Sequence, residues 1–75
     1  MAKENEMIIE LHNVLFKHHG ETSPIVHRLR EISDGNKKEI VNGLEAIISE
    51  LKTGDLKADS ATKQTIKHVY RQITQ

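Results

Sequence analysis

The chain has 75 residues, no cysteine and no tryptophan, and its 11 basic and 11 acidic side chains leave no formal net charge. This length allows one domain with a small core, the missing cysteines exclude disulfides and thiolate metal sites, and the charge balance gives no overall attraction to nucleic acid or anionic lipid. No apolar run approaches the roughly 20 residues that span a bilayer, and the acidic N-terminus does not resemble a signal peptide. We therefore expect a single soluble, cytoplasmic domain over residues 1–75, with no membrane partner.

A first helix is predicted over residues 3–18, with Gly20 as its stop. It carries acidic residues in its first turn and histidines in its last, as the helix dipole favours. Ile9 and Phe16 fall on a second apolar face, and His12 lies between the two faces. Either the helix is sandwiched between two others, or Ile9 and Phe16 face a partner. The main apolar stripe, expected to face the core, consists of Met7, Ile8, Leu11, Val14 and Leu15.

A second helix is predicted over residues 24–33. Ser23 can act as its N-cap, and Pro24 suits the first helical position because the N–H that proline lacks would have no partner there. A tight polar turn over residues 33–36 leads into the next helix. The buried side of this second helix is expected to consist of Ile25, Val26, Leu29 and Ile32.

The third helix, predicted over residues 36–53, has the most regular apolar face and is expected to organise the others. Asn36 and Glu39 can form a capping box at its start, and Gly54 can adopt the left-handed conformation that ends a helix. Its apolar residues recur at the i, i+3, i+4, i+7 spacing of one helical face, namely Ile40, Val41, Leu44, Ile47, Ile48 and Leu51.

A fourth helix is predicted over residues 59–73, after a polar connector whose Leu56 is expected to tuck into the core. Asp59 or Ser60 can cap it. Its apolar stripe consists of Thr62, Ile66, Val69, Tyr70 and Ile73, and the Tyr70 hydroxyl is expected to lie in water. The four helices together predict an all-α protein, a compact bundle of four short helices in which sequential helices are neighbours.

The second apolar face of the first helix is the first candidate site. Ile9, His12 and Phe16 would contact a partner protein or a second copy of the chain, with Phe16 as the aromatic anchor. This predicts a small non-enzymatic protein-interaction module, an inhibitor, adaptor or regulator that acts alone or as a homodimer. Its size and class are those of phage- or bacterium-type accessory proteins, and no sequence motif identifies a family.

A basic ridge on the fourth helix is the alternative site. Lys63, Lys67 and Arg71 follow one another at i, i+4 and i+8, where they can meet nucleic-acid phosphates or an acidic protein surface. The plainer interpretation is an ordinary solvated helix face. A helix-turn-helix motif is disfavoured because Glu31 stands where that motif needs a small residue, and because the third helix has an exposed face of mixed charge. Nucleic-acid binding is therefore the second hypothesis.

Metal binding and catalysis find little support in the sequence. The chain has five histidines, but no two are four residues apart, the spacing that places two ligands on one helix face. Nucleophile elbows, phosphate loops and glycine-rich dinucleotide turns are missing, and so small a domain has little room for a substrate cavity. We expect no metal, no cofactor, no catalytic residue and no small-molecule substrate.

Overall fold

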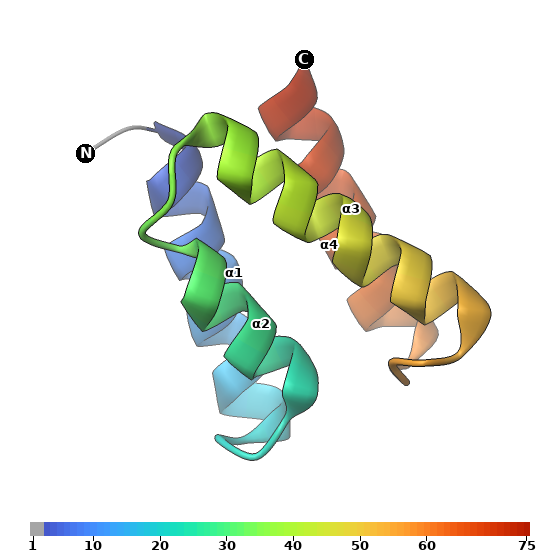
Figure 1. The fold of residues 1–75 in the computed structure, drawn as a ribbon. Coiled ribbons are helices and arrows are strands. Elements are labelled where there is room, and N and C mark those ends of the chain that lie inside the picture. The colour runs from blue at the N-terminus through green and yellow to red at the C-terminus, as the bar shows by residue number, and fades with distance from the viewer. Residues whose placement is uncertain (1–2) are drawn as a thin grey trace.

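The computed structural model describes residues 3–75, which form four helices and no strand (Figure 1). The predicted all-α class is confirmed. Each helix end lies within one residue of its predicted position. The helices are α1 (Lys3–His19), α2 (Pro24–Ile32), α3 (Lys37–Thr53) and α4 (Ser60–Thr74). None of these four has the length and apolarity that crossing a bilayer requires.

The helices form two antiparallel hairpins, α1 with α2 and α3 with α4 (Figure 1). Within residues 3–75, α1 and α3 each contact all three other helices, whereas α2 and α4 do not touch each other. The expectation that the third helix alone organises the chain was therefore incomplete. Both α1 and α3 have 17 residues, and together they hold the two hairpins against each other.

The predicted start and end of α3 are confirmed. The Glu39 backbone N–H donates to Asn36 Oδ1 at 2.9 Å, and the Asn36 backbone N–H donates to Glu39 Oε1 at 3.0 Å, which makes the capping box. Gly54 has a φ of 92°, and its N–H donates to the Glu50 carbonyl at 3.0 Å. A left-handed φ of this kind favours glycine, so the helix ends where the sequence places Gly54.

The caps of α4 and α2 differ from each other. Asp59 Oδ1 accepts the Thr62 backbone N–H at 2.8 Å, so Asp59 is the N-cap of α4. Ser23 occupies the N-cap position of α2, but its side chain makes no capping hydrogen bond. There the Ser23 carbonyl accepts the His27 N–H at 3.1 Å, and Pro24 removes one of the N–H groups that a cap would satisfy.

The core is aliphatic and draws on every helix and on Leu56 of the connector, as predicted. The half-buried apolar residues packed against it are Met7, Ile32, Val41, Ile48, Ala58, Val69 and Tyr70. The buried apolar side chains are Ile8, Leu11, Leu15, Ile25, Val26, Leu29, Ile40, Leu44, Ile47, Leu51, Leu56, Ile66 and Ile73.

One expectation about the predicted stripes was wrong. Val14, placed in the core stripe, is 45% exposed, because the buried arc of α1 centres on Ile8 and Leu15 and turns Val14 toward the surface. The Tyr70 hydroxyl lies at the exposed edge of the core, as expected, and in addition donates to Glu45 Oε2 at 2.7 Å, which links α4 to α3.

Candidate functional site

The first candidate site lies on the flank of α1 that faces α2. We call Ile9, His12 and Phe16 the aromatic patch. The His12 and Phe16 rings stack with their centroids 6.0 Å apart and their planes at 23°. Phe16 is 40% exposed and Ile9 is half-buried. The structure thus brings the three predicted residues together on one surface, and it leaves the aromatic ring open to solvent.

Two solvent-exposed polar contacts orient His12 within the aromatic patch, one to Arg30 of α2 and one to Asn13 of α1. Arg30 donates its Nε hydrogen to His12 Nε2 at 3.3 Å, and His12 Nδ1 lies 3.2 Å from Asn13 Oδ1. A neutral imidazole with its hydrogen on Nδ1 satisfies both contacts. The ring is therefore oriented before any partner arrives, and it supports one face of Phe16.

Arg30 supplies the charge beside the aromatic patch. Its side chain is 45% exposed, and its ion pair with Glu21 is long, 4.0 Å, with a carboxylate that is itself 73% exposed. Such an exposed pair is weak. The guanidinium therefore retains hydrogen-bond donors for a carboxylate presented from outside.

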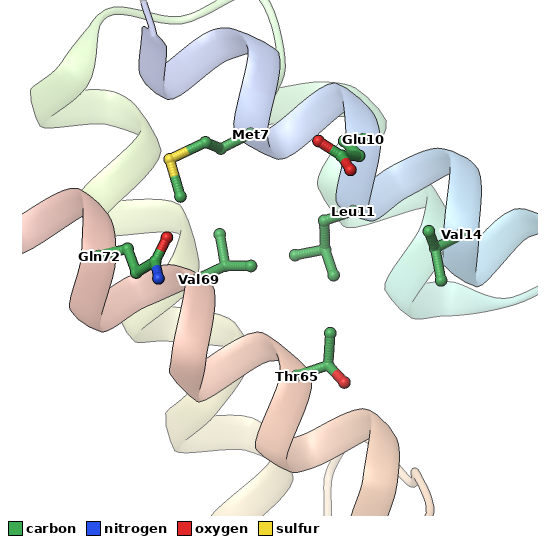
Figure 2. A pocket seen from close by; sticks show the side chains of 7 residues that line it. All are labelled: Met7, Glu10, Leu11, Val14, Thr65, Val69 and Gln72. Atoms are coloured by element: carbon green, nitrogen blue, oxygen red, sulfur yellow. The ribbon is translucent and has the colours of Figure 1, made fainter.

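The other flank of α1 forms a groove with α4 that the sequence analysis missed (Figure 2). Leu11 and Val69 project into its apolar middle, Met7 and Val14 lie toward its two ends, and Glu10 and Gln72 stand at its edges. Its cavity volume is about 230 Å³. We call it the α1–α4 groove, and its lining residues are Met7, Glu10, Leu11, Val14, Thr65, Val69 and Gln72. The sequence does show that both helices carry more apolar side chains than one contact needs. It does not show that these side chains of α1 and α4 face each other.

The basic ridge is divided by the packing of α4 on α3. Lys63 is half-buried and, with Lys67, lines a hollow of about 300 Å³ whose floor is Ile48 and Leu51. Lys52 of α3 lines the same hollow, and its position beside the ridge was not predicted. Farther along α4, Lys67 and Arg71 line a second, shallow hollow with Gln64, Thr65 and His68.

A cluster of polar side chains joins the end of α1 to the start of α4. His19 Nε2 lies 3.2 Å from Thr62 Oγ1, and Thr62 also donates its backbone N–H to Asp59. The Thr62 residue is only 6% exposed. Among residues 3–75, Asp59 forms its hydrogen bond with Thr62 and none with His19. The contacts cap a helix.

Among residues 3–75, no three histidine or carboxylate side chains lie close enough together to hold a metal ion. Comparison with family models, with curated proteins and with solved structures gives no match to this chain.

Proposed function

We propose that this chain is a non-enzymatic protein-interaction module, an inhibitor, adaptor or regulator, and that it binds a partner protein through the aromatic patch. The observation that supports this most directly is the 40% exposure of Phe16, one of only two aromatic residues in the chain apart from histidine. A protein with so few aromatic side chains gains most in stability by burying them, whereas aromatic anchors at interfaces supply a large share of binding energy.

The partner that fits the aromatic patch is an amphipathic helix with a large apolar side chain and a neighbouring carboxylate. The apolar side chain would pack on Phe16 and Ile9. The carboxylate would pair with Arg30, whose contact with Glu21 is weak and solvent-exposed. Because His12 is already held by Arg30 and Asn13, binding would cost little side-chain entropy at the centre of the contact.

A selection from a library of helical peptides tests this function. We expect the wild-type chain to enrich peptides that carry a large apolar residue and an acidic residue one turn away. Phe16→Ser should abolish the enrichment, and Arg30→Glu should change the preferred charge from acidic to basic. Val14→Ser is the matched control, because Val14 is exposed on the opposite flank of α1. Equal enrichment by wild type and Phe16→Ser would contradict the proposal.

Nucleic-acid binding is a second candidate, favoured by the clustering of Lys52 with the ridge residues Lys63 and Lys67. Binding through this ridge should weaken steeply with salt, because each phosphate contact releases counterions. We expect Lys52→Ala, Lys67→Ala and Arg71→Ala to weaken binding to single- and double-stranded probes by similar factors, whereas Lys17→Ala on α1 should not. A mobility-shift assay at low salt that shows no complex would remove this candidate.

A further inference from the structure

Near its middle the α1–α4 groove has one acidic and one basic edge, and the α1 side carries Lys17 two turns after Glu10. Glu10 stands on the α1 side (Figure 2), and Glu6 lies one turn earlier on the same helix. Beyond Thr65, the α4 side continues into the hollow that Lys67, His68 and Arg71 line. Within residues 3–75, Glu10, Lys67 and Arg71 take part in no ion pair. The apolar floor is thus flanked by unpaired charges of opposite sign.

We propose that a second copy of this chain docks on the α1–α4 groove about a two-fold axis that runs along the groove. A two-fold axis in the common plane of two such faces keeps their helices aligned in only two directions, across the groove or along it. An axis across the groove lays α4 on α4 and sets the basic edges against each other. An axis along the groove lays α1 of each copy on α4 of the other, so each acidic edge meets a basic edge.

The antiparallel course of α1 and α4 fixes which residues meet. The start of α1 lies beside the end of α4, where Met7 and Gln72 line one hollow. The end of α1 lies beside the start of α4, where Val14 and Thr65 line another. Glu10 is therefore level with the turn from His68 to Gln72. With the axis along the groove, Glu10 of each copy comes opposite Arg71 of the other, and the exposed Val14 packs over the other copy's α4.

The size of this face suits a weak dimer. The molecule measures 29 × 23 × 18 Å, so a face along its length offers roughly 500 Å² per copy, or about 1,000 Å² in total. That area is at or below the lower end for specific complexes, so the dimer is expected to be weak and to form only at high protein concentration. The aromatic patch lies on the other flank of α1, roughly 160° around the helix axis at about 100° per residue, so this dimer leaves it free and does not depend on it.

Charge reversal tests the proposal by sedimentation over a wide range of concentration. Glu10→Arg and Arg71→Glu should each weaken the dimer at least tenfold, because each puts two like-charged pairs into the contact. An equal mixture of the two variants should dimerise again, since both contacts of the mixed dimer would pair opposite charges at positions 10 and 71. A dimer that lays α1 on α1 would set position 10 against position 10 and position 71 against position 71. The mixture would associate there too, but neither single variant would weaken that dimer, so the weakening by each variant alone distinguishes the two arrangements. Two variants that stay monomeric when mixed would overturn the proposal.

A second pair of variants separates the groove from the aromatic patch. Val14→Glu should make the chain monomeric, while Phe16→Glu should leave the dimer intact, and thermal melts should show that both variants remain folded. A dimer that is lost with Phe16→Glu but kept with Val14→Glu would place self-association at the aromatic patch and overturn the proposal. A wild-type chain that is monomeric up to millimolar concentration would do so as well. Neither result bears on the peptide selection, which tests the aromatic patch.

Discussion

Arg28 on α2 and Glu50 on α3 form a two-point ion pair: Arg28 Nη2 lies 2.7 Å from Glu50 Oε2, and Arg28 Nη1 donates to Glu50 Oε1 at 3.0 Å. The pair joins the two hairpins across their boundary. The hydrogen bond from Arg28, aided by its charge, lowers the pKa of Glu50 against the opposing effect of burial. A group with a lowered pKa in the folded state contributes stability above its unfolded-state pKa, and this contribution is lost as the pH falls.

Glu50→Gln should therefore lower the melting temperature by a few degrees at neutral pH. The difference from wild type should shrink and vanish once the pH is well below the ordinary carboxyl value of 4.5, where Glu50 is protonated in both states. Glu21→Gln is the matched control, because the 4.0 Å contact of Glu21 with Arg30 is too exposed to matter. Thermal melts over a pH series measure both. A loss that is the same at acidic and neutral pH would contradict this account.

Gly43 of α3 packs directly against the Ile32 side chain of α2 and leaves no room for a side chain of its own. A Cβ added at Gly43 would lie 2.5 Å from Ile32 Cγ2. On an open helix surface, glycine to alanine stabilises by about 1 kcal/mol. Here Gly43→Ala should destabilise by about 1 to 3 kcal/mol, since the branched Ile32 side chain cannot swing away cheaply. Denaturant unfolding measures the change.

The control for Gly43 is Ser49→Ala on the exposed face of the same helix, which should change stability by less than about 0.5 kcal/mol. Shortening the neighbour gives a second check. In an Ile32→Ala background the penalty of Gly43→Ala should fall sharply, because the two sites are in contact and their effects do not add. Additive effects would show that the clash is relieved elsewhere.

The ionised Asp59 side chain makes the stability of the α4 N-terminus depend on pH. Hydrogen bonds from Thr62, the side chain first and the backbone N–H second, lower the pKa of Asp59, and the nearby His19 and His18 add to this. The stabilisation by ionised Asp59 is therefore present above the ordinary aspartate pKa and is lost as the pH falls through the folded-state value. Asp59→Ala should lower the melting temperature at neutral pH. Asp59→Asn, which keeps a capping oxygen, should lower it less and weaken its dependence on acidic pH.

Tyr70 offers a direct optical test of the α3–α4 contact. Its hydroxyl donates to Glu45, and that hydrogen bond, together with burial and the carboxylate's charge, raises the pKa of Tyr70 above 10.0. Because the chain has one tyrosine and no tryptophan, phenolate absorbance reports this residue alone. Glu45→Gln should return the titration toward the ordinary value, whereas Glu31→Gln on α2 should not move it. An identical titration in wild type and Glu45→Gln would show that the contact does not form in solution.

The helices and most of their ends could be predicted because their causes are local. The capping box of Asn36 and Glu39 and the stop at Gly54 involve atoms within four residues of each other. The aromatic patch was predicted for the same reason, since Ile9, His12 and Phe16 share a flank by their spacing alone. The exposure of Val14, the hydroxyl contact of Tyr70 and the position of Lys52 beside Lys63 and Lys67 were not predicted, because each depends on how another helix packs.

The sequence by itself determined which residues are helical and how each side chain is directed around its own helix axis, because hydrogen bonding and side-chain spacing along a helix are short-range. Only the tertiary structure decided which sides of α1 remain exposed to solvent and that the Ile32 side chain packs against Gly43. It also decided that acidic and basic edges flank one apolar groove. The distances between helix axes set these features. They follow from the simultaneous packing of side chains far apart in the chain, which no periodicity within one helix specifies.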